Sequence, residues 1–433
     1  MAKKLWEKGI ETDAFIEAFT VGKDRELDLE LAKYDVQGTI AHITMLESVG
    51  LLEKKELEVL VKELNRILED VIESGEFLIE EGVEDVHSQI ELMLTRKLGD
   101  VGKKVHSGRS RNDQVLVDLK LYLRAQIIEL AGLSQKLFNT LIEQSEVNKE
   151  ALLPGYTHTQ AAMPSSFGLW FGAYAESLVD DLILMQAAHT IVNQNPLGSA
   201  AGYGSSFPLN RALTTELLGF SNTNTNVVYA QMGRGKAEQT VAFAMAGLAG
   251  TLNKLASDVC LYNSQNFAFI KLPDELTTGS SIMPHKKNPD VFELIRAKTN
   301  MLKALPTTIS SVTSNLTSGY HRDFQVLKEV LFPAIKELKD CLFITDYSVS
   351  KIRVMEDILD DPKYKLIFSV EAVNELVLKG IPFREAYQQV GKQIQEGTFE
   401  PPTELKHTHE GSLGNLSNEK IKARMKEVWR GFK

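Results

Sequence analysis

The chain has 433 residues, and its 48 Lys and Arg against 58 Asp and Glu give a formal net charge of −10. Proteins that bind nucleic acid through bulk charge are usually basic, so this composition argues against that class. The two cysteines, Cys260 and Cys341, have no second Cys or His at metal-ligand spacing, which argues against a disulfide framework or a zinc site.

The first part of the chain predicts long helices, because none of the 13 prolines precedes Pro154. Residues 1–7 lack the apolar run of a signal peptide, so we expect a cytoplasmic protein. In residues 51–74, apolar side chains recur at steps of three and four, which is typical of one face of an amphipathic helix.

Further helical patterns follow along the chain, and convincing alternation of apolar and polar residues is absent. We expect helices over 115–147, 161–194, 237–262, 290–317, 325–350, 366–379, 383–396 and 418–430. Residues 241–250 offer no polar face, so neighbouring elements must enclose them. A membrane-spanning helix needs about 20 consecutive apolar residues, and no uncharged stretch of the sequence meets this requirement, so no membrane partner is expected. The pattern predicts an all-α fold.

Glycine-, serine- and proline-rich stretches mark the expected boundaries. They lie at 75–113, 195–211, 272–289 and 397–417. We expect an N-terminal helical domain over 1–105, a central long-helix bundle over 106–350, and a small C-terminal helical domain over 351–433.

A polar segment at 103–114 carries cations and hydroxyls just before the long helix that is expected to begin near Val115. Backbone N–H groups at a helix start, with arginines beside them, favour an anion. The structural alternative is a well-capped helix start, with Ser110 or Asn112 as the N-cap residue.

A second polar segment, 154–160, places His158 in a turn-like stretch between two helices. Histidine is the side chain best suited to move a proton near neutral pH. The alternative is a structural histidine that is hydrogen-bonded to backbone.

The third segment, 278–290, combines a flexible hydroxyl-bearing stretch with a helix opening. Asn288 suits the N-cap, Pro289 the first helical position, and Asp290 the first turn. Lys286 and Lys287 precede that opening and suggest a second anion site, with a loop able to close over a ligand. Two local basic clusters on an acidic chain favour a small anionic ligand, such as a di- or tricarboxylate, over a polyanion.

Residues 279–289 (GSSIMPHKKNP) closely resemble the long signature loop of the fumarase/aspartase superfamily. Residues 106–114 (HSGRSRNDQ) and 155–160 (GYTHTQ) resemble the other two motifs in the form found in the argininosuccinate lyase family. Further matches run from Leu5-Trp6 to residues 379–386. The resemblance implies a three-domain, all-α fold, a homotetramer with a helical core, active sites built from three subunits, and neither metal nor cofactor.

The reaction of this family is a β-elimination that splits argininosuccinate into arginine and fumarate, the last step of arginine biosynthesis. It needs a base, cations on the carboxylate that gains charge, and a proton for the leaving nitrogen. By resemblance, Ser280 is the base, and Lys286 and Asn288 bind the substrate carboxylate. His158 is tied to the acid role, and Glu293 is its acidic partner.

The resemblance also implies a set of substrate-binding residues. Those that match are Ser110, Arg111, Asn112 and Thr157, with Tyr320, Gln325, Lys328 and Asp28 for the arginine half; Arg234 is a weaker match. The chain departs from the family pattern at His285, where glutamine is usual, and in residues 7–10, 200–204 and 233–239.

Two alternatives remain open at this point. Another lyase of the superfamily, such as adenylosuccinate lyase, aspartase or fumarase, would keep the fold and change the leaving group. A non-catalytic, crystallin-like structural role would keep the fold without turnover, but the joint presence of Ser280, Lys286, His158 and Glu293 argues against it.

Overall fold

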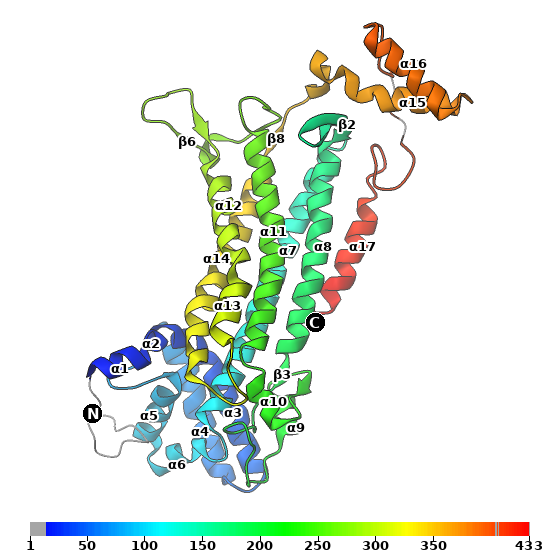
Figure 1. The fold of residues 1–433 in the computed structure, drawn as a ribbon. Coiled ribbons are helices and arrows are strands. Elements are labelled where there is room, and N and C mark those ends of the chain that lie inside the picture. Colours follow the sequence, from blue (N-terminus) through cyan, green and yellow to red (C-terminus); the bar gives the residue numbers. More distant parts are fainter. Residues whose placement is uncertain (1–13, 403–404, 406, 433) are drawn as a thin grey trace. The chain divides into compact units, whose positions relative to one another are not determined.

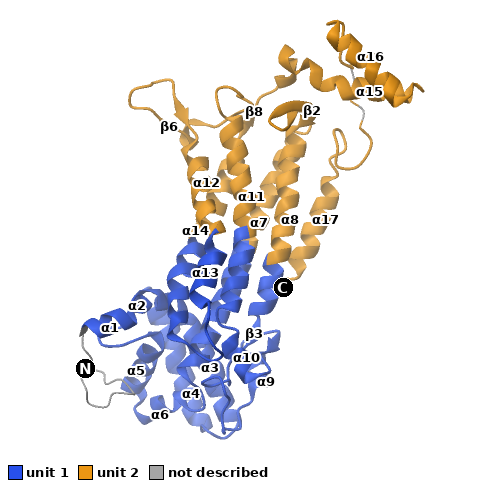
Figure 2. Cartoon of the chain, viewed as in Figure 1, with its two compact units in different colours: residues 1–130, 185–246, 304–336 blue, residues 131–184, 247–303, 337–433 orange. Residues whose placement is uncertain are grey.

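The computed structural model describes residues 14–402, 405 and 407–432, so Leu5-Trp6 and the departure at 7–10 lie outside the described residues. The described chain is predominantly helical, as predicted (Figure 1). It forms two compact units (Figure 2). Unit 1 comprises Met1–Leu130, Met185–Ala246 and Ala304–Lys336, and unit 2 comprises Ala131–Leu184, Gly247–Lys303 and Glu337–Lys433.

The three-domain division at residues 105 and 350 stays a prediction. Several long helices contribute residues to both units: α7 (Arg111–Val147), α8 (Phe167–Val192), α11 (Lys236–Tyr262) and α14 (Val326–Val349). The compact units therefore do not follow continuous segments of sequence.

Unit 1 holds the remaining elements of its N-terminal segment and of its two later segments, 185–246 and 304–336. Its other elements are α1 (Ala14–Val21), α2 (Asp24–Leu27), η1 (Asp28–Leu31), α3 (Ala32–Ser48), α4 (Lys54–Arg66), the π-helical η2 (Ile67–Ile72), α5 (Val86–Leu98), α6 (Asp100–Lys103), η3 (Lys104–His106), β3 (Gln194–Asn195), α9 (Arg211–Leu217), β4 (Asn222–Thr223), α10 (Val227–Met232), α13 (Leu305–Thr313) and η5 (Arg322–Gln325). The short strands β3 and β4 pair in parallel.

The core of unit 1 forms where α3 packs against α4, α5 and α9. The helical spacing predicted over 51–74 places Leu60, Leu64 and Ile67 on one face, and all three are fully buried. Each such side chain contributes about 1.5–3 kcal/mol by leaving water. This packing holds α3 and α5, which carry residues of the site described below.

Unit 2 contains the remaining elements. They are β1 (Leu152–Thr157), β2 (Gln160–Ser166), β5 (Ile270–Lys271), η4 (Asp274–Leu276), β6 (Thr278–Gly279), β7 (Lys287–Asn288), α12 (Asp290–Lys303), β8 (Arg353–Val354), η6 (Ile358–Asp360), η7 (Pro362–Phe368), α15 (Ser369–Leu378), α16 (Phe383–Gln395) and α17 (Asn418–Arg430). Helices α15 and α16 pack on each other around a small apolar cluster of their own.

The sequence did not predict the hairpin of β1 and β2, which are antiparallel and carry a bulge at Gly155/Tyr156. The expected helix over 161–194 therefore begins only at Phe167. Pro154, Pro164 and small polar residues hide the alternation that marks a strand. The expected turn at His158 is confirmed, because His158 and Thr159 have φ values of 53° and 59° between the two strands.

Residues 241–250 of α11 are enclosed on most sides, as predicted. Val241, Met245 and Leu248 are fully buried, whereas Phe243 is 59% exposed. Large apolar side chains are also exposed elsewhere on the long helices of both units; they include Ile128, Ile183, Leu184, Leu261, Leu294, Met301 and Phe343.

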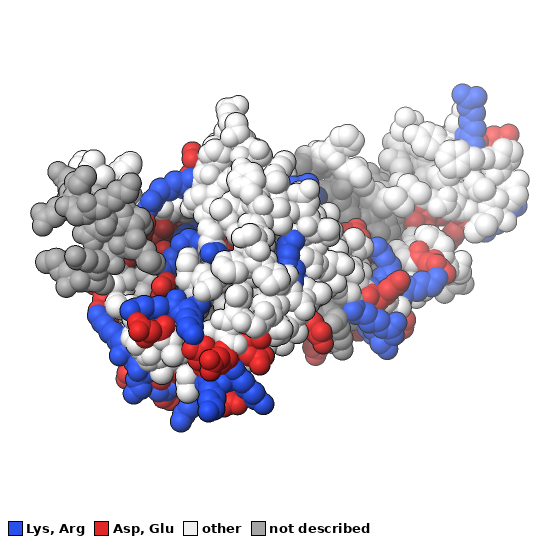
Figure 3. All heavy atoms as spheres, turned by 90° about the horizontal axis from the view of Figure 1, so that it is seen from below, with Lys and Arg blue, Asp and Glu red and all other residues white. Residues whose placement is uncertain are grey.

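Charged side chains of both signs are interspersed on the face of the molecule in Figure 3. Within the described residues, no helix combines the length and the apolar character needed to cross a membrane.

Candidate active site

A cavity of about 470 Å³ lies in unit 1, and charged and polar side chains dominate its wall. The lining residues come from α2, η1, the segment before α5, α5 itself, η3, the start of α7, η5 and the start of α14. They include the acids Asp24, Asp28, Glu84, Asp85 and Glu91 and the bases Arg111, Arg234, Arg322 and Lys328. Of the substrate-binding residues predicted from sequence, Asp28, Arg111, Asn112, Tyr320, Gln325 and Lys328 line this cavity. A wall with both signs of charge suits a zwitterionic small molecule.

Lys328 is buried at the cavity and ion-paired with two carboxylates. Its Nζ lies 2.5 Å from Asp28 Oδ1 and 2.7 Å from Asp24 Oδ1. Burial would lower the pKa of Lys328, but the two carboxylates outweigh burial and raise it. Burial raises the pKa of Asp24 to about 6 although Lys328 opposes that shift.

The sequence interpretation missed Asp24. The signal was available, because Asp24 stands four residues before Asp28, and this spacing puts two side chains on one helical face.

Ser110 directly precedes α7, and its hydroxyl accepts the backbone N–H of Asn112 at 3.2 Å. This agrees with the capping role that was one of the two interpretations of the segment. Buried Asp113 ties the segment to the loop after β3, because its carboxylate accepts N–H groups from Ser110, Gly198 and Ala200 at 2.8–3.0 Å.

Among the lysines and arginines of 103–111, all of them described, only Arg111 lines the cavity, and His106 lines it as well. Its guanidinium lies 3.1 Å from Glu91 Oε2 and donates to Gln114 at 3.1 Å. Lys103 and Lys104 instead pair with Asp100 and Glu56 on exposed surface. The predicted anion site at this helix start therefore reduces to one arginine that a carboxylate already neutralises in part.

Gln325 is fixed at the cavity by backbone, since its amide donates to Thr20 O at 2.9 Å and Val21 O at 3.0 Å. Arg322, which was not singled out from sequence, pairs with Glu84 at 2.9 Å and donates to Gln325 at 3.1 Å. Arg234 is buried against Glu238 at 3.1 Å, and its Nη1 has no hydrogen-bond partner within the described residues.

The signature loop lies in unit 2, between β6 and β7, which pair through Thr278–Asn288 and Gly279–Lys287. Ser280 is partly exposed, and its hydroxyl accepts the N–H of Met283 at 3.2 Å. Lys286 is exposed, and Lys287 pairs with Asp274. Helix α12 begins at Asp290, and the carbonyl of Pro289 accepts its first N–H bonds. The helix opening is thus one residue later than predicted: Pro289, not Asn288, takes the N-cap position.

Unit 2 also holds Thr157, His158 and Glu293, and all three side chains are exposed. Glu293 lies 3.8 Å from Arg296 in its own helix. Within the described residues, no hydrogen bond or ion pair joins His158, Glu293 and Ser280 to one another. The single chain therefore gathers the predicted residues at the cavity, whereas the predicted catalytic residues share no hydrogen bond or ion pair within the described residues.

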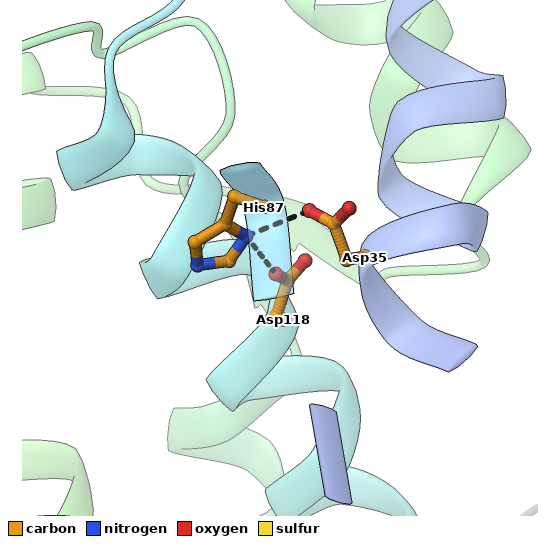
Figure 4. Close-up of side chains that lie close together, drawn as sticks. All are labelled: Asp35, His87 and Asp118. Atoms are coloured by element: carbon orange, nitrogen blue, oxygen red, sulfur yellow. Dashed lines mark hydrogen bonds and ion pairs between the residues drawn. The ribbon is translucent and has the colours of Figure 1, made fainter. Parts of the chain in front are cut away.

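Beside the cavity, three buried side chains of unit 1 meet in a cluster that the sequence interpretation did not single out (Figure 4). His87 Nδ1 lies 2.8 Å from Asp35 Oδ1 and 3.3 Å from Asp118 Oδ2. Gln114 donates to the same oxygen of Asp35 at 2.6 Å. Carboxylates and imidazole are also metal ligands, but here Nδ1 is hydrogen-bonded to Asp35, and the Arg109 charge acts on both carboxyl groups.

Burial alone would raise the pKa of Asp35, but His87, Arg109 and Gln114 outweigh burial and lower it to about 2. Burial and the neighbouring Asp35 charge raise the pKa of Asp118 well above its usual range. Ionisation of Asp35 is therefore favoured, and ionisation of Asp118 beside it is disfavoured.

Comparison with known proteins places the chain among lyases. The family model described as Lyase matches residues 7–303. An argininosuccinate lyase of Parabacteroides distasonis is 66% identical over 432 residues, which cover 100% of this chain and 97% of that protein. An argininosuccinate lyase of Thermotoga neapolitana is 40% identical and covers 91% of this chain and 98% of its own.

A solved structure of an EDDS lyase variant with bound fumarate has the same fold. Its TM-score is 0.77 at 21% identity, and the match covers 98% of this chain and 91% of that one. Identity over the full chain, together with this helical fold, shows that the chain belongs to the argininosuccinate lyase family of the fumarase/aspartase superfamily.

Proposed function

We propose that this chain is an argininosuccinate lyase that splits its small-molecule substrate into arginine and fumarate. One observation carries the proposal: relatives of that name are 62–66% identical to it over its whole length. Another superfamily lyase or a crystallin-like role is not favoured by this identity. A cytoplasmic location and a place in arginine biosynthesis remain predictions.

The cavity of unit 1 supplies groups for the arginine half of the substrate. That half carries a carboxylate, an ammonium group and a guanidinium group. Asp24 and Asp28 offer acceptors, Lys328 offers a cation, and the exposed hydroxyl of Tyr320 can complete the contact. Ser110, Arg111, Asn112 and Thr157 are proposed for further substrate contacts.

The elimination itself is assigned to the loop of unit 2. Ser280 removes the proton from the carbon beside a succinyl carboxylate, while Lys286 and Asn288 stabilise the negative charge that this carboxylate gains. The electron pair then forms the fumarate double bond as the C–N bond breaks. A serine hydroxyl is a weak base in water, so the loop must close over substrate among cations before Ser280 can act.

His158 is assigned to the acid step, with Glu293 orienting its imidazole. The leaving guanidinium nitrogen gains a proton as the C–N bond breaks, either from His158 or from a water that it polarises. Because both side chains are exposed and unconnected in one chain, their meeting requires further copies of the chain.

A homotetramer with shared active sites would supply those copies. The exposed apolar side chains on α7, α8, α11, α12 and α14 support this assembly, since such patches on helices usually mark interfaces. A mass measurement in solution tests it, and a monomer with full activity would contradict it.

The activity is tested by incubating the purified chain with a panel of argininosuccinate, adenylosuccinate, aspartate and malate while fumarate absorbance is followed. Fumarate release from argininosuccinate alone is expected. Preferred release from another member of the panel would reassign the substrate, and no release from any of them would leave a non-catalytic role.

A further inference from the structure

The Asp35–His87–Asp118 cluster leaves one polar atom that the proposed reaction does not use. His87 is 1% exposed, lines the cavity of unit 1, and has no hydrogen-bond partner at Nε2 within the described residues. A buried nitrogen without a partner costs about 1–3 kcal/mol, so such an atom beside a cavity points to a ligand.

The orientation of the ring follows from its neighbours. Both contacts of Nδ1 are carboxyl oxygens, and Asp35 is ionised, so Nδ1 carries a proton and donates it to Asp35. Figure 4 shows Nε2 on the opposite side of the ring from both acids. The cluster thereby fixes the ring and leaves Nε2 as the atom without a partner on a residue that lines the cavity.

The surrounding charges indicate what Nε2 can bind. Nδ1 faces two carboxyl oxygens, which favours the tautomer with the ring proton at Nδ1. In that tautomer the ring offers a lone pair at Nε2. Glu84, Asp85 and Glu91 lie on the same wall and also favour a cationic, N–H-bearing ligand.

We propose that His87 is a further substrate-binding residue: its Nε2 accepts a hydrogen bond from an ammonium or guanidinium N–H of the arginine half, and Asp35 positions the ring. This inference rests on the proposed function, because it names the substrate group that meets this atom. Asp118 lies 3.3 Å from the same nitrogen, Nδ1.

Two substitutions of His87 distinguish the role of Nδ1 from that of Nε2. His87→Asn keeps a side-chain N–H near the position of Nδ1, facing Asp35, but has no atom at Nε2. His87→Gln places its amide near the position of Nε2 but has no N–H near the position of Nδ1 to donate to Asp35. Each is made in the Ser280→Ala background, and argininosuccinate binding is measured by calorimetry without turnover; kcat and KM are measured in the otherwise wild-type chain.

The proposal expects His87→Asn to weaken substrate binding by about 10- to 100-fold, the size of a lost hydrogen bond to a charged group. His87→Gln should bind more tightly than His87→Asn. The control is His42→Asn, at a buried histidine outside the cavity whose Nε2 bonds Ser107 O at 2.8 Å. It should lower the melting temperature and leave KM unchanged.

Equal KM and Kd for wild type and folded His87→Asn would overturn the proposal, and so would tighter binding by His87→Asn than by His87→Gln. A loss of binding on chelation that added Zn²⁺ or Mn²⁺ restores would assign the three residues to a metal instead. If the wild-type chain releases no fumarate from argininosuccinate, the proposed function fails; if it does and His87→Asn matches it, only this inference fails.

Discussion

The candidate residues of unit 1 and those of unit 2 differ in how firmly the chain holds them. At the cavity, Lys328, Arg111 and Gln325 are each bonded to acids or backbone and are at least partly buried. In unit 2, Lys286 and His158 are exposed on a loop and a turn. One chain thus preorganises the groups that line the cavity, whereas it leaves the proposed catalytic groups of unit 2 exposed.

The largest expected effect is a loss of turnover when the loop between β6 and β7 of unit 2 is altered. Ser280→Ala should lower turnover by at least about 100-fold, the scale of a positioned proton transfer, with the fold and substrate binding retained. Fumarate absorbance and calorimetry measure the two quantities. The matched control is Ser281→Ala, which should lose less than about tenfold. Wild-type-like turnover by Ser280→Ala would remove Ser280 as the base.

Substitution of Lys328, which lines the cavity of unit 1, should lower both the stability of the protein and its affinity for substrate. Lys328→Met leaves Asp24 and Asp28 without their shared cation, and breaking a buried pair costs about 3–5 kcal/mol. We expect the free energy of unfolding to fall by that amount and KM to rise at least about tenfold. Exposed Lys336 on the same helix is the control, since Lys336→Met should stay within about 0.5 kcal/mol.

In the Asp35–His87–Asp118 cluster, substitution of the two acids should lower kcat/KM to different extents. Asparagine resembles the protonated carboxyl group that the raised pKa of Asp118 favours, but at position 35 it removes the charge of an ionised carboxylate. Asp35→Asn should therefore lower kcat/KM by about tenfold or more, and Asp118→Asn only by a few-fold. Fumarate kinetics and melting temperatures check the order, and a larger loss in Asp118→Asn would contradict the assigned protonation states.

The last effect concerns the pH dependence of stability in unit 2, and no change in activity is expected from it. Burial raises the pKa of Asp181 to about 6 although a hydrogen bond from Thr251 opposes the shift. The protonated folded form is thus favoured, and its stabilising contribution is lost as pH rises from about 4 to 6. Asp181→Asn should match wild type near pH 4 and exceed it by about 2–3 kcal/mol above pH 7 in denaturant unfolding. A constant difference across this range would contradict the shifted pKa.

The sequence predicted most of the helical architecture because periodicity and the absence of early prolines are local signals. It did not predict β1 and β2, whose prolines and small residues carry no alternation, and it placed the N-cap of α12 one residue early.

Among the site residues, sequence motifs located those that line the cavity, such as Lys328 and Arg111. They missed Asp24 and His87, whose importance arises from tertiary neighbours rather than from the residues beside them in sequence. The groups that meet His158 and Ser280 could not be predicted either, because under the proposed function they come from other copies of the chain.

The central claim is that each active site combines a cavity from one copy with the loop and turn of others. Co-expression of Ser280→Ala and Asp28→Asn chains with different tags, followed by purification through both tags, tests it most directly. Mixed oligomers should release fumarate from argininosuccinate much faster than either single variant. Some of their active sites combine an intact Asp28 from one chain with an intact Ser280 from another. Mixed oligomers that stay as inactive as the parents, and as the Asp28→Asn/Ser280→Ala double variant, would contradict the claim.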